Sequence, residues 1–376
     1  MPLPPATRFT PRAATWDLFC RVIDNHGDLG VSWRLARALA RRGVAVRLWV
    51  DDASALTWMA PHLGGGGEPG VQVIAWTDSP DPVPGLQPGD VVVETFGCDP
   101  PPAFVARMAA MARPPVWINL EYLSAEDYVE RSHRLASPQF SGPGQGLTKW
   151  FFYPGFTAAT GGLMHDDVPA GAAAEHRAWL QAQGWCAAGD WPVSLFCYDN
   201  PALPGLIQRL PAWAGGAPVR LLAAPGAAQR QVQALADAGA LPAGAAVTAL
   251  PWLPQPDYDR LLAGCALNLV RGEDSFVRAQ VASAAPMLWQ IYPQHDGVHA
   301  AKLEAFVRRL TAGAPPALAA TVAQAQRAAN GLAPWPEALP PAADWAALHT
   351  RWRDGLRSRT DLVSQLQQFV MGKTLE

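Results

Sequence analysis

A βαβ pattern opens the sequence and constrains the fold more than any other feature. The apolar, β-prone residues 16–23 lead into a turn at 24–30 that is rich in Gly, Asp and Asn. Residues 31–42 then carry apolar side chains at helical spacing and stop at Gly43, and residues 44–50 are β-prone again. A strand, a glycine-containing turn, a helix and a strand in this order open a doubly wound sheet.

The same alternation continues through most of the chain. In the first half we expect strands at residues 71–76, 90–95 and 115–120 and a helix at 103–112. After a helix at 172–183, a strand at 191–197 restarts the pattern. Further helices are expected at 203–213, 229–238, 258–263, 276–284 and 300–310, and further strands at 219–223, 246–250, 266–270 and 287–291.

The length of the chain indicates that this repeated pattern forms two domains. A chain of 376 residues exceeds what one hydrophobic core usually serves. We therefore predict an α/β protein with two Rossmann-like lobes facing a central cleft, residues 1–165 and 166–344, with the boundary near 157–173. A Pro- and Ala-rich stretch at 314–343 precedes one long amphipathic helix at 345–371. We expect this C-terminal segment, 345–376, to cross back onto the first lobe.

Charge and cysteine content exclude several classes of protein. A net charge of -3 with 16% charged residues gives no broad surface for nucleic acid or for an anionic membrane. The five cysteines are scattered and lack C-x-x-C spacing, as is typical of reduced thiols in a cytosolic protein. The first twelve residues contain no signal-peptide-like apolar run, and no segment approaches the roughly 20 apolar residues that span a bilayer. We expect a cytoplasmic protein without nucleic-acid or membrane partners.

The first candidate site is the turn after the first strand. Ligands of doubly wound sheets bind at the carboxyl ends of the strands, where this turn places Asp24 and Asp28. Two carboxylates on one turn can hold a planar group with several donors, or one can orient it while the other takes a proton. An equally compatible interpretation is structural, with Asp28 capping the helix and Asp24 forming an Asx-turn. Gly27 and Gly30 lack the third glycine of a dinucleotide fingerprint, which disfavours a dehydrogenase.

A second candidate site, residues 271–275, follows the strand at 266–270 and opens a helix. Backbone N–H groups at a helix start, together with Arg271 and the Ser275 hydroxyl, can hold a diphosphate. Glu273 and Asp274 are better suited to hydroxyls or to a cationic acceptor. The alternative is that Asp274 or Ser275 is only a helix cap.

Aromatic residues near strand ends of the second lobe form a third candidate site. A flat base stacks on aromatic rings and is oriented by one or two polar side chains. Core packing is the alternative for any single ring. The residues are Phe196, Tyr198, Trp252, Gln255 and Tyr258.

A metal site is not expected. His295 and His299 are four residues apart, but a zinc site needs a third ligand, and no H-E-x-x-H motif or matching Cys/His set is present.

Five motifs in order resemble the elongation factor P arginine rhamnosyltransferases. They are FCRVIDNHGDLGVSWRLA at 19–36, LEYLSAE at 120–126, WFFYPGF at 150–156 with TGGL at 160–163, RGEDS at 271–275 and WQIYPQ at 289–294. The resemblance runs from about Asp17 to the C-terminal helix. It implies a GT-B fold, a dTDP-β-L-rhamnose donor, no metal or other cofactor, and inversion at the anomeric carbon. The implied acceptor is an arginine in the N-terminal domain of elongation factor P, whose modification activates it for rescue of ribosomes stalled at polyproline.

The resemblance also implies roles for individual residues. The first lobe would hold the acceptor protein and the second the nucleotide sugar. Two positions, His26 and Trp252, depart from the family pattern. The implied roles are general base for Asp28, assisted by Asp24 and Glu273; diphosphate binding for Arg271, Asp274 and Ser275; thymine binding for Phe196, Tyr198, Trp252, Gln255 and Tyr258; and acceptor binding for Asn25, Gly27, Glu121 and Tyr122.

Two other functions are compatible with the same residues. A nucleotide-sugar epimerase of this fold would convert the donor without a protein acceptor. A non-catalytic partner of elongation factor P would bind it tightly without changing its mass.

Overall fold

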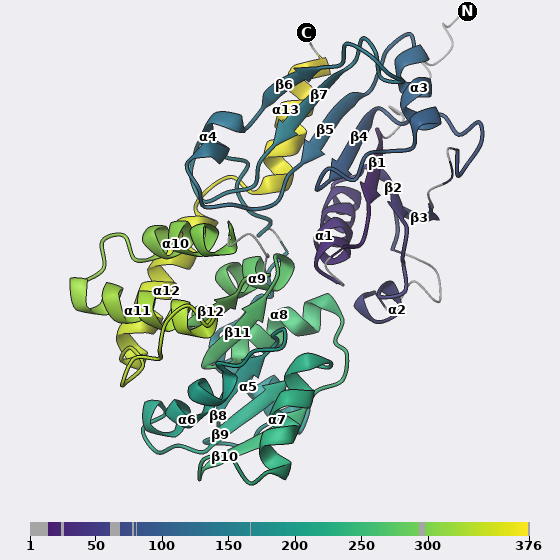
Figure 1. Ribbon diagram of the computed structural model, residues 1–376. Helices are drawn as coiled ribbons and strands as arrows, with labels where there is room; N and C mark the ends of the chain where they lie inside the picture. The colour runs from purple at the N-terminus through teal and green to yellow at the C-terminus, as the bar shows by residue number, and fades with distance from the viewer. Residues whose placement is uncertain are drawn as a thin grey trace, which may run out of the picture.

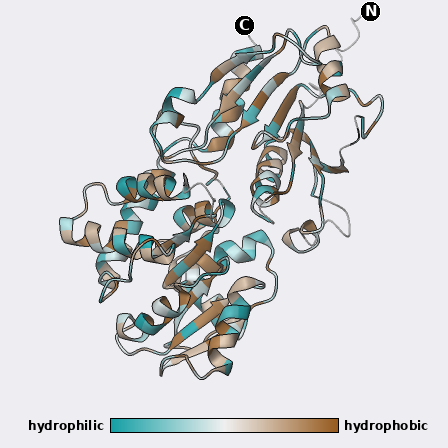
Figure 2. Cartoon of the chain, in the orientation of Figure 1, coloured by the Kyte–Doolittle hydropathy of each residue, from teal (hydrophilic) through white to brown (hydrophobic). Residues whose placement is uncertain are grey.

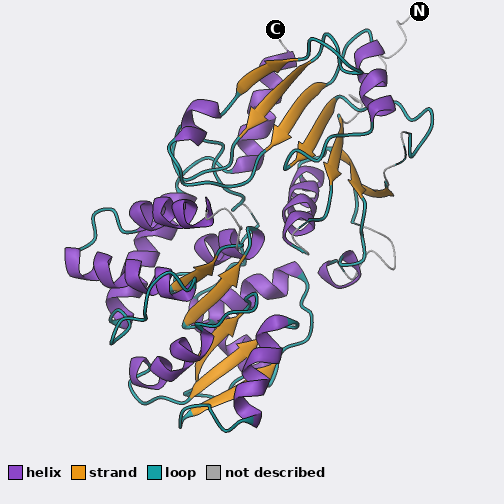
Figure 3. Cartoon of the chain, in the orientation of Figure 1, coloured by secondary structure: helices purple, strands orange, loops and turns teal. Residues whose placement is uncertain are grey.

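Two α/β lobes make up the protein (Figures 1 and 3). The computed structural model describes residues 14–23, 26–60, 68–76, 79, 81–165, 167–292 and 298–374. Within them each lobe has one sheet, with a hydrophobic cluster on each of its faces. The predicted two-lobed α/β architecture is confirmed.

The first lobe is built on a seven-stranded sheet in the order β3-β2-β1-β4-β5-β7-β6. All neighbouring strands are parallel except β6 and β7. The strands are β1 (Thr15–Cys20), β2 (Ala45–Val50), β3 (Val71–Ala75), β4 (Val91–Thr95), β5 (Val116–Leu120), β6 (Leu135–Pro138) and β7 (Thr148–Phe152), and the helices are α1 (Gly27–Arg41), α2 (Leu56–Met59), α3 (Pro102–Ala110) and α4 (Tyr128–Ser132).

The second lobe is built on a five-stranded parallel sheet in the order β10-β9-β8-β11-β12. Its central strands are buried at all but one position each and are rich in Val and Leu, as is typical of parallel strands covered on both faces. Figure 2 shows this concentration of hydrophobic residues along the strands. The elements are β8 (Trp191–Leu195), β9 (Val219–Ala223), β10 (Ala245–Ala249), β11 (Leu267–Arg271), β12 (Met287–Gln290), α5 (Ala173–Ala182), α6 (Leu203–Trp213), α7 (Ala227–Asp237), α8 (Gln255–Gly264), α9 (Asp274–Ala282), α10 (Val298–Leu310) and α11 (Pro316–Ala329).

The C-terminal segment crosses back to the first lobe as predicted, but the single helix expected at 345–371 is wrong. It consists of α12 (Ala342–Arg357) and α13 (Leu362–Thr374). The break arises because the Asp361 carboxylate accepts the backbone N–H groups of Val363 and Ser364 at 3.0 Å each, which caps a new helix. Only α13 joins the first hydrophobic core, whereas α12 packs on the second lobe. The domain limits at 165 and 344 stay a prediction.

Several elements were not expected from the sequence. They are α2, α4, the β6–β7 hairpin and α11, the last lying in the Pro- and Ala-rich stretch. In α11 Pro316 occupies the first turn, where proline is compatible with a helix, and alanines fill the rest. Helix α1 begins at Gly27 rather than at the predicted residue 31. This earlier start places Asp28 in the first helical turn.

Candidate functional site

The two candidate turns lie together in the cleft. Helix α1 follows β1 and helix α9 follows β11, so both helices begin at the carboxyl ends of central strands. The helices are in close contact, since a Cβ added to Gly30 would lie 3.2 Å from Oδ2 of Asp274. The structure therefore brings Asp28 of the first lobe and residues 271–275 of the second lobe to one place.

A buried ion-pair network holds the lobes together behind these turns. Arg34 of α1 donates from Nη1 and Nη2 to the carboxylate of Asp259 at 2.9 Å each, and from Nε to Asp274 at 2.7 Å. Arg278 donates to the same Asp259 at 2.9 and 3.1 Å and pairs with Asp167 at 3.1 Å. Burial alone would lower the pKa of Arg34, but Asp259, Asp274 and Asp167 outweigh it and raise that pKa. We call these five residues the interlobe clasp.

One cavity in the cleft carries the candidate catalytic carboxylates. Asp28 is 2% exposed, and its Oδ2 accepts the backbone N–H of Ile23 at 2.9 Å. The Tyr122 hydroxyl donates to its Oδ1 at 3.3 Å. This carboxylate cavity, about 860 Å³ including open solvent, is lined by Ile23, Gly27, Asp28, Tyr122, Leu123, Gly272, Glu273, Phe276, Trp289, Ile291, Tyr292 and Lys302.

Glu273 is the second carboxylate of this cavity. Its Oε2 accepts the backbone N–H of Leu123 at 3.0 Å. Burial raises the pKa of Glu273 to about 8; the Leu123 N–H opposes this shift, and the charge of Asp28 adds to it. Near neutral pH this carboxyl therefore holds a proton in the free protein, and a cation in the cavity would favour its release.

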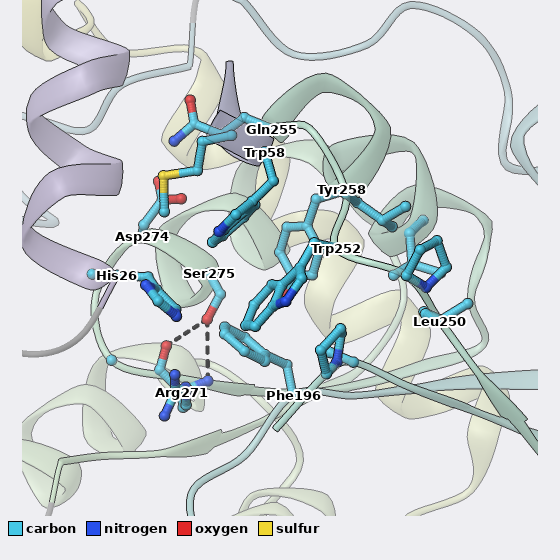
Figure 4. Close-up of a pocket in the computed structure, with 18 residues that line it drawn as sticks. His26, Trp58, Phe196, Leu250, Trp252, Gln255, Tyr258, Arg271, Asp274 and Ser275 are labelled. Atoms are coloured by element: carbon cyan, nitrogen blue, oxygen red, sulfur yellow. Dashed lines mark hydrogen bonds between the residues drawn. The ribbon is translucent and has the colours of Figure 1, made fainter. Parts of the chain in front are cut away.

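A second cavity collects most of the residues assigned to the nucleotide sugar (Figure 4). It encloses about 700 Å³ including open solvent. The predicted residues that line it are Phe196, Trp252, Gln255, Tyr258, Arg271, Asp274 and Ser275, and first-lobe residues His26, Gly27, Trp58 and Met59 line it as well. We call it the aromatic cavity.

Arg271 and Ser275 are held in defined positions in the aromatic cavity. The Arg271 guanidinium lies over the rings of Phe196 and Tyr198, 4.5 Å from each centroid. The Ser275 hydroxyl accepts the Arg271 N–H at 3.1 Å and donates to the Arg271 carbonyl (Figure 4). Ser275 thereby closes the turn. The cap position of α9 is Glu273 rather than Asp274 or Ser275, and its side chain makes no cap hydrogen bond.

The two cavities are adjacent and share two glycines. Gly27 and Gly272 line both of them. Gly272 has a φ of +59°, a left-handed backbone conformation that glycine adopts without strain. This turn directs Arg271 into the aromatic cavity and Glu273 into the carboxylate cavity. A cationic group in the carboxylate cavity and a nucleotide in the aromatic cavity can thus lie next to each other.

The remaining predicted residues lie in or near this region. Gln255 donates from Nε2 to the Gly30 carbonyl at 2.9 Å, while its buried Oε1 has no hydrogen-bond partner among the described residues. Tyr198 contacts Arg271 from outside the aromatic cavity and meets Tyr292 edge-on. Glu121 accepts a hydrogen bond from Asn119 and lines a neighbouring space.

Three predicted or discussed residues, Asp24, Asn25 and His295, lie outside the described residues. The capping role considered for Asp28 is not observed, because His26 occupies the cap position of α1 and no side chain caps it. Among the described residues no three His, Cys, Asp or Glu side chains gather as metal ligands would. Metal independence itself stays a prediction.

Sequence reasoning missed Arg34 of the interlobe clasp and several residues of the two cavities. Arg34 had a signal in the sequence, since it is a charged residue on the apolar, buried stripe of α1. Tyr292 lies within the motif at 289–294. Lys302 and Trp58 had no such signal in the sequence, because the folding of distant segments brings them to the cleft.

Comparison with known proteins shows a family match along most of the chain. Residues 16–371 match the family model described as Elongation-Factor P (EF-P) rhamnosyltransferase EarP. The chain is 44% identical over 320 residues to a protein-arginine rhamnosyltransferase of Pseudomonas putida, covering 80% of this chain and 82% of the relative. It is 40% identical over 384 aligned positions to a protein-arginine rhamnosyltransferase of Pseudomonas aeruginosa, covering 95% and 98%.

Solved structures support the same fold. A structure described as the structural basis for EarP-mediated arginine glycosylation of translation elongation factor EF-P is 29% identical, with a TM-score of 0.56 over 96% of this chain and 99% of that one. The glycotransferase of kitacinnamycin, 15% identical, has a TM-score of 0.51 over 96% and 99%. The predicted GT-B fold is confirmed.

None of the helices in the described part of the chain combines the length and the apolar character that a membrane span requires.

Proposed function

This chain belongs to the elongation factor P rhamnosyltransferase family, and we infer that it is a protein-arginine rhamnosyltransferase that modifies elongation factor P (EF-P). We propose that it moves L-rhamnose from dTDP-β-L-rhamnose to a guanidino nitrogen, with inversion, in the cytoplasm where EF-P acts. The observation that carries this proposal is the pair of adjacent cavities, one with carboxylates and one with aromatic rings and an arginine.

The carboxylate cavity suits a guanidinium acceptor. Guanidinium is planar, charged near neutral pH and a poor nucleophile, so it must be gripped and deprotonated as it reacts. Asp28 and Glu273 line the cavity from opposite lobes. Asp28 takes the proton as the C–N bond forms, and Glu273 orients the guanidinium. In this proposal Asp24 assists Asp28. The acceptor protein is contacted by Asn25, Gly27, Glu121 and Tyr122.

The aromatic cavity suits a nucleoside diphosphate. Phe196, Trp252 and Tyr258 offer ring faces or edges to the base. The Oε1 of Gln255, which has no hydrogen-bond partner in the described part of the chain, can accept the imide N–H of the base. As the bond from the anomeric carbon to the diphosphate oxygen breaks, negative charge accumulates on the leaving group. Arg271 and the N-terminus of α9, with Ser275, stabilise that charge.

Intact-protein mass spectrometry tests this function. The purified chain is incubated with EF-P and dTDP-L-rhamnose in the presence of EDTA, and we expect EF-P to gain one deoxyhexose on an arginine. Omitting the donor is the control. Donor conversion without a gain would favour an epimerase, and tight EF-P binding with an intact donor would favour a non-catalytic partner. Activity that EDTA abolishes would contradict metal independence.

Glu273 predicts the pH dependence of the reaction. Its raised pKa, about 8, means that the free enzyme must lose this proton to bind guanidinium. We therefore expect kcat/KM for EF-P to rise about tenfold per pH unit below pH 8 and to level off above it. In Glu273→Gln this dependence disappears. Initial rates between pH 6 and 9 measure the profile, and an unchanged slope in the variant would remove Glu273 from this role.

A further inference from the structure

The first lobe contributes an aromatic ring to the cavity assigned to the second lobe. Trp58 lies on α2, and its ring stacks on Trp252 with centroids 4.5 Å apart and planes inclined by 25°. Both rings line the aromatic cavity. The transfer reaction proposed above gives Trp58 no role.

His26 holds this pair of rings in place. Its imidazole meets Trp58 at 5.2 Å and Trp252 at 5.1 Å between centroids, nearly perpendicular to both. Edge-to-face contacts of this kind are favourable. Two separate segments of the first lobe therefore meet one residue of the second. We call His26, Trp58 and Trp252 the aromatic bridge.

The bridge determines which face of Trp252 a base can use. Because Trp58 already lies at stacking distance, no base fits between the two indoles. In Figure 4 the ring of Trp252 lies between those of Trp58 and Phe196. A base that stacks on Trp252 therefore uses the face directed toward Phe196, while Trp58 supports the other face.

We propose that Trp58 is a donor-positioning residue, which holds Trp252 as the stacking platform for the donor's base. The inference rests on the proposed function of the aromatic cavity as the donor site. It follows that the base site is complete only while the two lobes are in contact. Donor affinity then depends on a first-lobe residue that acts through Trp252.

Calorimetric titration with dTDP tests the role of Trp58. We expect W58A and W58L to bind dTDP about tenfold more weakly, since base–aromatic stacking contributes on that order. The KM for dTDP-L-rhamnose should rise by the same factor, with kcat changed less than about twofold. W58F keeps a ring and should bind within about threefold of the wild type. W58L fills the space without a ring and separates stacking from packing.

Trp150 provides the matched control. Like Trp58, it is a half-buried tryptophan of the first lobe, but it lies outside both cavities. Its ring packs against that of Phe369 of α13, with 5.6 Å between the ring centroids. W150A should lower thermal stability without raising the donor KM. In a W252A background, W58A should cause no further loss of dTDP binding.

The outcomes separate this inference from the proposed function. If W58A and W58L bind dTDP as the wild type does while F196A loses binding, the aromatic cavity remains the donor site and the role of Trp58 is overturned. A loss in W150A equal to that in W58A overturns it too, because the effect would belong to the lobe as a whole. If F196A and R271A also bind dTDP normally, the donor site itself is misplaced.

Discussion

Replacing Asp28 with Asn lowers kcat about 10³-fold, which corresponds to about 4 kcal/mol of transition-state stabilisation. The amide cannot take the guanidinium proton, but it matches the carboxylate in size. Its oxygen can still accept the Ile23 N–H that Asp28 accepts at 2.9 Å. We therefore expect the fold and the affinity for dTDP to be retained. Single-turnover rates with saturating EF-P and dTDP-L-rhamnose measure the effect.

Asp51 is the matched control for this variant. Its Oδ1 accepts the backbone N–H of Val22 at 2.9 Å, one residue before Ile23, but it lines neither cavity. Asp51→Asn should therefore keep kcat within about threefold. Near-wild-type turnover by D28N, or an equal loss in D51N, would show that Asp28 is not the base.

Arg34→Met lowers the free energy of unfolding by about 3–5 kcal/mol, the usual cost of breaking a buried ion pair from one side. Arg34 is 2% exposed and joins Asp259 and Asp274 across the lobes. Among the described residues Asp259 would then keep the hydrogen bonds from Arg278, and Asp274 would lose its ion pair with Arg34. Urea unfolding followed by circular dichroism measures the loss.

Arg41 is the control on the same helix. Its side chain is 50% exposed and lies 3.9 Å from Glu68 and 4.0 Å from Asp167, distances at which solvent screens the attraction. Arg41→Met should change stability by less than about 1 kcal/mol. A loss in Arg34→Met no larger than that in Arg41→Met would mean that the buried ion pairs of Arg34 contribute little to stability.

The architecture could be predicted from the sequence because the apolar pattern of each strand and helix lies within one short segment. The strands of the second lobe are short apolar runs, and the helices between them have apolar residues at helical spacing. Burial on both faces of a parallel sheet requires such a pattern, so most elements could be placed within a few residues. The break before α13 was missed because it depends on one cap at Asp361 within a continuous amphipathic pattern.

The candidate site was partly predictable for the same reason. The motifs at 24–30 and 271–275 lie at strand ends, and the topology of a doubly wound sheet directs such ends into one cleft. Local sequence thus proposed Asp28, Arg271 and Glu273 as candidate site residues, and the structure places them in two adjacent cavities. Local sequence also identified the glycine turns that orient them.

Only the tertiary structure decided which residues of one lobe meet the other. Arg34 and Asp274 are 240 positions apart, and Trp58 and Trp252 are almost as distant, yet both pairs are in contact. The approach of two independently folded sheets creates these contacts, and no periodicity within either sheet encodes it. Part of the rise in the pKa of Glu273 has the same origin, because the Asp28 charge that adds to it belongs to the opposite lobe.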